Sequence, residues 1–249
     1  MRMDNKKKTF RFEKKYLISR DTAYLLKQRL SYILRPDPSA PGGKYTVSSV
    51  YFDDQYNTSF YEKQSGDLKR DKFRIRYYNG DTGITRLERK HKYGEMVHKE
   101  SALLITEQYR MMNCGEYAFM TKQPNPVFDR FYTAHVLKHM RPVITVDYTR
   151  QAYVHQAGNV RITFDTGLSA SLPAESYSFS VSTDGNIILE VKYDHFLPAF
   201  IDDLLAGFTL TRLAISKFVM AKLVLQGMHI NNRTVLNDRI VDRTHIQIQ

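Results

Sequence analysis

Alternating basic and apolar residues are the feature of this sequence that most restricts its fold. In Lys72–Arg76 the order is Lys-Phe-Arg-Ile-Arg, so Arg74 and Arg76 share one face of an extended strand while Phe73 and Ile75 share the other. The same spacing recurs along the chain and groups Glu88 with Lys90, Arg161 with Thr163 and Asp165, and Glu190 with Lys192. The repetition predicts a sheet with one apolar face and one charged face.

A charged face of this kind has two explanations, and periodicity alone does not choose between them. Two cations about 7 Å apart repel by roughly 2 kcal/mol at an effective dielectric constant near 20. Several such pairs on one face therefore need either bulk water, as on a half-solvated sheet, or a polyanion. If the charged faces point inward, about eight strands can close into a barrel wide enough for a ligand.

Composition restricts the class of protein further. The 249 residues, 42% of them hydrophobic, suffice for one sizeable domain with a substantial core. No apolar run approaches the roughly 18 residues of a membrane span. The basic segment Met1–Lys8 lacks the apolar core of a signal peptide, and the single Cys114 excludes an intramolecular disulfide. We therefore expect a cytoplasmic protein.

The formal net charge of +11 implies an anionic partner, which can be nucleic acid, an anionic membrane surface or a phosphate-rich substrate. The run Lys6-Lys7-Lys8 is interpreted as a solvated end of the chain, so the informative cations are those inside the strand patterns.

The expected elements indicate an α+β fold with mainly antiparallel pairing. Strands are expected near residues 11–18, 45–52, 72–79, 84–92, 96–104, 143–154, 159–165 and 187–194. Helices are expected after a cap at Ser19, from Thr106 toward Met120, from Pro126 through Met140, from Pro198 to Gly207 and over about 212–226. Asp53–Gln64 is expected to form a short helix or turn, and Asn79–Gly83 a hairpin turn.

Several common catalytic and cofactor sites are absent from the sequence. There is no Gly-rich phosphate loop, no dinucleotide fingerprint, no cysteine pair for zinc and no H-E-x-x-H motif. No Ser or Cys nucleophile has an evident triad partner. What remains are cations and two carboxylates, Glu88 and Glu190, each of which fits either a salt bridge or a hard-metal ligand. Together they are typical of a phosphoryl-transfer site, where positioning and charge neutralisation supply most of the catalysis.

Between about residues 9 and 226 the sequence resembles the VTC domain, because nine short motifs occur in the order found in that family. They are Arg11-Phe-Glu13-Lys-Lys15-Tyr16-Leu17, Val50-Tyr-Phe-Asp53-Asp54, Phe73-Arg74-Ile-Arg76-Tyr-Tyr78, Leu87-Glu88-Arg-Lys90, Lys99-Glu-Ser101, Asp147-Tyr-Thr-Arg150, Val160-Arg161-Ile-Thr-Phe-Asp165-Thr166, Ile188-Leu-Glu190-Val-Lys192 and Ile215-Ser216-Lys217-Phe218. The family includes the polyphosphate-making subunits of the vacuolar transporter chaperone as well as bacterial members. Its larger grouping is the triphosphate tunnel metalloenzymes, the CYTH-like superfamily.

The resemblance implies that the charged faces point inward. The expected fold is a closed, mainly antiparallel eight-stranded β tunnel over residues 9–227, with peripheral helices, a C-terminal helix and an extension over 228–249. The residues that it implies as catalytic are Arg74, Arg76, Lys90, Arg150, Arg161 and Lys217. Those that it implies as further phosphate ligands are Lys15, Lys99, Lys192 and Ser216. Glu190 would bind a divalent metal, Mn²⁺ or Mg²⁺, and Glu88 would serve on the metal side or orient a cation.

One departure from the wider group bears on the reaction. Hydrolytic relatives typically carry E-x-E-x-K on the first strand, whereas this chain has Arg11-Phe-Glu13-Lys14-Lys15, with one usable glutamate. The difference weakens the interpretation as a triphosphatase and agrees with the polymerase branch.

The resemblance therefore predicts a metal-dependent polyphosphate polymerase that transfers the γ-phosphoryl group of ATP to a growing chain. Its partners would be ATP and inorganic polyphosphate or pyrophosphate, with no nucleic acid expected; a membrane-protein partner and the oligomeric state stay open. Two alternatives are hydrolysis of tripolyphosphate or a nucleoside triphosphate, and non-catalytic binding of polyphosphate or nucleic acid. The last is kept because 17 tyrosines among many cations also suit a single-strand platform.

Overall fold

The computed structural model describes residues 11–94, 96–173, 175 and 177–227. The basic run Lys6–Lys8 and the extension 228–249 lie outside these residues. Within them, no helix is long and apolar enough to cross a membrane.

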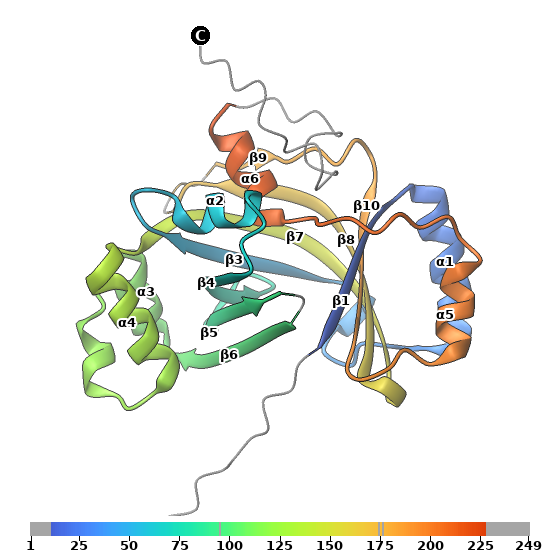
Figure 1. Cartoon of the computed structure of the whole chain (residues 1–249), viewed down its shortest axis with the longest axis horizontal. Helices are drawn as coiled ribbons and strands as arrows, with labels where there is room; N and C mark the ends of the chain where they lie inside the picture. Colours follow the sequence, from blue (N-terminus) through green and yellow to red (C-terminus); the bar gives the residue numbers. More distant parts are fainter. Residues whose placement is uncertain (1–10, 95, 174, 176, 228–249) are drawn as a thin grey trace, which may run out of the picture.

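One antiparallel sheet forms the centre of the molecule (Figure 1). Its strand order is β1-β10-β8-β7-β3-β4-β5-β6, with two short strands attached to the side of this path. The bounds are β1 Phe12–Ile18, β3 Tyr45–Asp53, β4 Lys69–Tyr78, β5 Asp81–Tyr93, β6 Met96–Leu104, β7 Arg141–His155, β8 Val160–Ser171 and β10 Ile187–Tyr193, and the short strands are β2 Arg35–Pro36 and β9 Phe179–Ser180. The predicted α+β class and antiparallel pairing are confirmed.

The expected closed eight-stranded tunnel is not confirmed. Among the described residues the sheet has ten strands, and no backbone hydrogen bonds join its terminal strands β1 and β6. Side chains bridge part of the opening instead, because Lys90 of β5 donates to Glu13 of β1 over 2.9 Å. The sheet is thus strongly curved, and an ion pair rather than a strand ladder links its two ends.

Six α-helices surround the sheet in the described part of the chain. Their bounds are α1 Arg20–Ile33, α2 Thr58–Gln64, α3 Thr106–Asn113, α4 Pro126–Lys138, α5 Ala199–Ala206 and α6 Lys217–Leu225, and the 3₁₀ turns are η1 Pro41–Gly43, η2 Ala118–Lys122 and η3 Ala157–Asn159. The predicted cap of α1 is present, since Ser19 accepts the backbone N–H of Thr22. Helix α4 begins at Pro126 as predicted, and Asn125 caps it by accepting the N–H of Val127.

Two predicted helices have different bounds in the structure. The helix expected from Thr106 toward Met120 ends at Asn113 and is followed by the separate turn η2. Its cap position is Ile105, whose backbone N–H donates to the side chain of Gln108. The last helix begins at Lys217 rather than near residue 212, because Ser216 caps it by accepting the N–H of Val219.

Three apolar cores explain which strand faces are left for the charges. Both helix pairs cover the convex face of the curved sheet, α1 and α5 over β1, β10 and β8 at one end, and α3 and α4 over β3 to β6 at the other (Figure 1). A third core joins α6 to β7 and β8. Phe73 and Ile75 are 4% and 0% exposed within the core beneath α3 and α4. Since strand residues alternate, Arg74 and Arg76 must point to the concave side.

Candidate functional site

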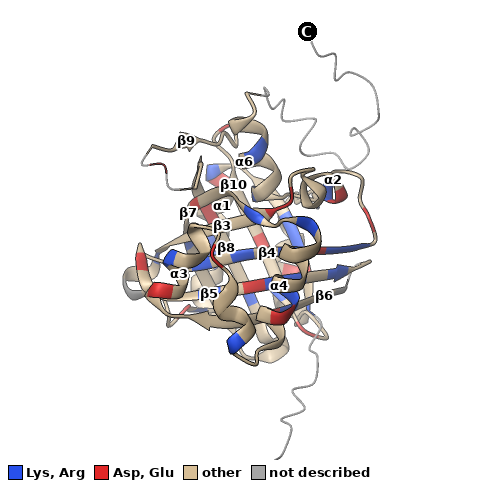
Figure 2. Ribbon diagram, turned by 90° about the vertical axis from the view of Figure 1, so that its left-hand side faces the viewer, with Lys and Arg blue, Asp and Glu red and all other residues tan. Residues whose placement is uncertain are grey.

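The concave side of the sheet holds a cavity of about 480 Å³ whose lining is strongly basic. Figure 2 shows that basic and acidic residues follow the central strands as well as the helices. The cations of the lining are Lys15, Lys63, Arg70, Lys72, Arg74, Arg76, Lys90, Lys92, Arg150, Lys192, Arg212 and Lys217. Only two carboxylates, Glu13 and Glu190, line it in the described part of the chain. The cations therefore outnumber the anions twelve to two, which selects for a polyanionic ligand.

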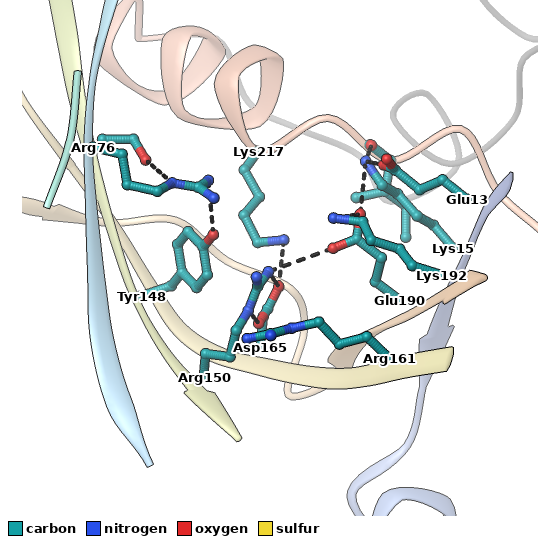
Figure 3. Close-up of polar contacts among 12 residues, drawn as sticks. Glu13, Lys15, Arg76, Tyr148, Arg150, Arg161, Asp165, Glu190, Lys192 and Lys217 are labelled. Carbon is teal, nitrogen blue, oxygen red and sulfur yellow. Dashed lines mark hydrogen bonds and ion pairs between the residues drawn. The ribbon is translucent and has the colours of Figure 1, made fainter. Parts of the chain in front are cut away.

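Strands β1 and β10 place the two carboxylates among lysines. Their antiparallel register sets Lys15 opposite Glu190 and Glu13 opposite Lys192. Lys15 Nζ is 2.9 Å from Glu13 Oε1 and 3.9 Å from Glu190 Oε1, while Lys192 Nζ is 3.3 Å from the same Glu190 oxygen (Figure 3). Burial alone would raise the pKa of Glu13, but Lys15, Lys90 and Lys192 hold it well below its ordinary value. Glu13 is consequently suited to act as an anion.

A second cluster joins β7, β8 and the first residue of α6. Arg150 binds Asp165 through two hydrogen bonds of 2.6 and 2.7 Å, and Lys217 Nζ is 2.7 Å from the same carboxylate (Figure 3). Despite its burial, Asp165 has a pKa held well below the ordinary range by Lys217 and Arg150. The Lys217 ammonium also lies 4.7 Å from the ring centre of Tyr148. Asp165 thus fixes the direction of two cations at the cavity wall.

Glu88 has a comparable effect on Arg74. Two guanidinium nitrogens of Arg74 each lie 2.8 Å from Glu88 Oε2, and a third donates to the hydroxyl of Tyr51 over 3.1 Å. Lys99 reaches the other oxygen of Glu88 at 2.5 Å from the far side. Burial and the neighbouring arginines lower the pKa of Lys99 to about 8, although Glu88 opposes the shift. Glu88 and Lys99 lie outside the cavity lining, so the contacts of Glu88 fit the cation-orienting role better than the metal role.

Arg76 differs from the other predicted arginines. It is 8% exposed, and its hydrogen bonds go to neutral oxygens, namely the hydroxyls of Ser49 and Tyr148, each at 3.4 Å. Among the described residues no carboxylate forms an ion pair with its guanidinium. Arg76 is therefore a buried cation without a carboxylate in direct contact among the described residues, and Glu88 acts on its charge from farther away.

Arg161 shares the concave face of β8 with Asp165, but its side chain is engaged beside this cavity (Figure 3). Its guanidinium contacts Asp37 and donates to the hydroxyl of Tyr45 over 2.7 Å. Asp37 is 3% exposed, so the pair ties β8 to the segment after β2. Arg161 does not contribute to the lining.

Nine of the twelve predicted site residues come together in the cavity. They are Lys15, Arg74, Arg76, Lys90, Arg150, Glu190, Lys192, Ser216 and Lys217. Of the other three, Glu88 binds Arg74 and Lys99 from outside the lining, and Arg161 pairs with Asp37 beside it.

The sequence interpretation left out further residues of the site, among them Glu13, Tyr51, Lys72, Tyr148 and Asp165. Glu13, Lys72 and Asp165 share strand faces with predicted residues, so alternation could have included them. The two tyrosines carried no comparable signal.

Divalent cations of the hard type bind oxygen, and the cavity offers oxygen from Glu13 and Glu190. The described residues contain no group of three or more His, Cys, Asp or Glu side chains that could hold a metal by themselves. A metal in this cavity would therefore need additional oxygen ligands, which phosphate groups can provide.

A curved antiparallel sheet around a cavity with this excess of cations is suited to a ligand with several negative charges. The family model of the VTC domain matches residues 10–226, and the chain therefore belongs to the VTC domain family. The resemblance read from the nine motifs is confirmed. None of the curated proteins matches the chain.

Two solved structures are similar to this chain. A proposed adenylate cyclase from Bacillus halodurans superimposes with a TM-score of 0.52 and 14% identity, over 82% of this chain and 92% of that chain. A second proposed adenylate cyclase, from Vibrio parahaemolyticus, has a TM-score of 0.49 and 13% identity, over 86% of this chain and 98% of that chain. At such identities the first similarity indicates a shared fold, and the activities of these proteins do not transfer.

Proposed function

We propose that the protein is a metal-dependent polyphosphate polymerase that moves the γ-phosphoryl group of ATP onto a growing polyphosphate chain. The observation that carries this proposal is the cavity in which twelve cations face two carboxylates. Linked phosphates bring several negative charges at short spacing, and they match a concave row of cations better than a flat or singly charged ligand does.

The transfer centre is assigned to three cations that converge on Tyr148. Arg76 donates to the hydroxyl of this tyrosine, and Arg150 and Lys217 lie 5.2 and 4.7 Å from its ring centre. Asp165 holds Arg150 and Lys217, so these cations are positioned before the ligand arrives. Preorganised cations of this kind stabilise the charge that develops on a transferred phosphoryl group.

A side-chain nucleophile is not required for this reaction. The acceptor phosphate carries its own negative charge and can attack directly, so the protein must mainly align the two phosphates and neutralise their repulsion. Ser216 is the only serine among the described residues that line the cavity, and its hydroxyl accepts the backbone N–H of Val219 as the cap of α6.

Glu190 would hold the divalent metal, with Glu13 beside it on the neighbouring strand. One or two carboxylates are sufficient when substrate phosphates supply the remaining oxygen ligands. When bound, the metal would neutralise phosphate oxygens and help to orient them.

The residue that precedes β1, Arg11, supports transfer to phosphate over transfer to water. Hydrolytic relatives carry a glutamate two positions before the equivalent of Glu13, whereas this chain has Arg11 there. Its guanidinium lies 2.8 Å from Asp194 and does not line the cavity. The metal site thus has one fewer carboxylate than the E-x-E-x-K pattern would supply.

Purified protein incubated with ATP and Mn²⁺ tests the proposal. Polyphosphate long enough to form a ladder on a gel is expected, and Arg76→Met should remove it. The control is Lys69→Met, because Lys69 lies exposed on the same strand outside the cavity lining. Release of free phosphate without polymer would identify a hydrolase, and tight polyphosphate binding without either product would identify a binding protein. Both results would overturn the polymerase assignment.

A further inference from the structure

The cations of β4 are unevenly balanced along the strand. Arg74 lies opposite Glu88 in the register of β4 and β5 and binds it, but Lys72 lies opposite Lys90. Like charges directly opposite each other destabilise a strand pair. The charge of Lys90 is balanced by an ion pair of 2.9 Å with Glu13. Of the two opposed lysines, Lys72 is therefore the one without a carboxylate partner among the described residues.

Lys72 is held in the cavity by an aromatic ring. Its ammonium lies 4.5 Å from the ring centre of Phe218, the residue that follows Lys217 in α6. In the described part of the chain it makes no ion pair with a carboxylate. Asp53 is the acidic group whose charge acts on it, but that carboxylate already accepts the backbone N–H groups of Ser59 and Phe60.

The surroundings of Lys72 favour an anion. Burial, together with Arg70, Lys63 and Lys90, lowers its pKa well below the ordinary value. A folded protein that keeps an ammonium group among cations, on an aromatic face and away from carboxylates, carries a destabilising arrangement unless a ligand relieves it.

The position of Lys72 separates it from the transfer centre. Alternate residues of a strand are about 6.8 Å apart, so Lys72 lies about 14 Å along β4 from Arg76. Linked phosphates anchored at Arg76, Arg150 and Lys217 would have to extend along β4, past Arg74, to reach Lys72. A longer phosphate chain would cover it.

We propose that Lys72, seated on the ring of Phe218, is part of a second phosphate subsite that holds linear inorganic polyphosphate beyond the three phosphates at the transfer centre. The inference rests on the proposed function, which it extends by naming the residue that distinguishes a polymer from a triphosphate. Lys72 acts here as a binding residue and takes no part in bond formation.

Calorimetric titration of the whole chain with tripolyphosphate and with a long linear polyphosphate, at one ionic strength, tests this subsite. The wild type should bind the long chain more tightly, per chain, than tripolyphosphate. In Lys72→Met the long-chain affinity should fall by about tenfold, equivalent to about 1.4 kcal/mol, while the tripolyphosphate affinity changes by less than about twofold. Methionine keeps the apolar stem against Phe218 and removes the charge.

Two further variants keep the result interpretable. Lys72→Arg should restore the long-chain affinity, because it retains a cation on the ring. Lys69→Met removes an exposed lysine of the same strand and should leave both affinities unchanged. Equal losses for both ligands in Lys72→Met, no loss for either, or failure of Lys72→Arg to restore binding would overturn the inference.

The calorimetric binding measurements do not depend on whether the protein turns over ATP. If the protein makes no polymer from ATP, the proposed function fails while the length dependence of binding still tests Lys72. If polymer forms, Lys72→Met should shorten the product on a gel. Full-length product from this variant would overturn the subsite and leave the polymerase assignment intact.

Discussion

Arg76 and Arg150 line the same cavity, yet their charges are balanced in different ways. Arg150 forms a bidentate pair with Asp165, which is 3% exposed, whereas Arg76 contacts only hydroxyl groups. Removing one partner of a buried ion pair leaves the other charge uncompensated, but removing an unbalanced cation does not.

Arg150→Met should therefore lower the free energy of unfolding in the absence of ligand, by less than the about 3–5 kcal/mol of a fully uncompensated buried charge, because Lys217 still pairs with Asp165. Arg76→Met should leave it unchanged or raise it, and should reduce phosphoryl transfer by about 10³-fold. Thermal melts without ligand, combined with turnover of the folded variants, measure both effects. A clearly destabilised yet active Arg76→Met protein would show that Arg76 serves as a structural residue.

Glu190→Gln should abolish metal-dependent turnover while the protein stays folded. The change keeps the size of the side chain but removes the charge that a divalent cation requires. The loss of charge should leave Lys192 and Lys15 with one carboxylate fewer, so anion binding without metal should be retained or strengthened. Turnover across a Mn²⁺ titration measures the first effect, and tripolyphosphate titration in a chelator measures the second. Wild-type turnover by the variant would remove Glu190 from the site.

The lowered pKa of Lys72 predicts proton uptake on binding. Because the folded pKa lies below the ordinary 10.5, the unfolded chain binds more protons in that interval, and the empty protein gains stability as the pH rises through it. A bound polyanion stabilises the ammonium form and reverses this preference, so long-chain affinity should decrease as the pH rises.

Calorimetry at about pH 8.5, in two buffers of different ionisation heat, should detect fewer protons taken up by Lys72→Met than by the wild type. Lys90 and Lys192, whose pKa values are also lowered, are present in both proteins, so the difference in uptake reports on Lys72 and on its coupling to Lys90. Identical proton uptake in both proteins would contradict the assignment.

Among the elements, the turn η3 between β7 and β8 has the strictest steric requirement. Gly158 has a φ of +68°, and a Cβ atom there would meet the carbonyl oxygen of Phe196 at 2.4 Å. Gly185, in the turn before β10, has a similar φ of +75° but open space around it. Alanine at Gly185 would therefore introduce backbone strain alone, whereas alanine at Gly158 would add a steric clash to the same strain.

Gly158→Ala should destabilise the protein by more than Gly185→Ala, with about 1 kcal/mol expected for the strained backbone alone in either case. Chemical denaturation of the two variants gives the difference directly. Equal losses of unfolding free energy in the two variants would mean that the segment around Phe196 can move away from the added methyl group without destabilising the protein.

Helix α6 connects the apolar core to the cavity. Phe218 lies against Tyr51 with ring centres 5.0 Å apart, and the preceding Lys217 reaches Asp165. Because Ser216 caps the helix, the side chains of its first turn are set at the cavity wall. The shorter helix observed here is thus what places Lys217 and Phe218 in the site.

At the scale of the whole molecule, the cations that line the cavity repel one another, and a bound anion would reduce this repulsion. Tripolyphosphate or polyphosphate should raise the melting temperature, because a ligand at a hundredfold excess over Kd stabilises the folded state by about 2.7 kcal/mol. For a chain of this size that is a shift of about 5–10 °C. Melting with tripolyphosphate, and with sulfate at equal ionic strength as control, measures it. An equal shift with sulfate would indicate general screening of surface charge.

Much of the fold could be predicted from the sequence because its signals are local. The alternation at Phe73–Arg76 depends only on strand geometry, and the caps Ser19 and Asn125 depend on residues within one turn of each helix. The eight longer strands follow from such patterns, while β2 and β9, with two residues each, are too short to carry one.

Tertiary structure decided what local patterns could not. Lys90 pairs with Glu13 across 77 positions, Arg161 turns to Asp37 across 124, and Lys72 packs on Phe218, because the curvature of the sheet brings these residues together. By itself the sequence determined that one strand face is charged. The helices that bury the apolar strand faces decided that the charged face lies inside the curved sheet. Because β1 and β6 are not paired with each other, side chains rather than backbone groups bridge the two ends of the sheet. The physical reason is that alternation follows from backbone geometry within a few residues, whereas enclosure depends on the packing of the whole sheet.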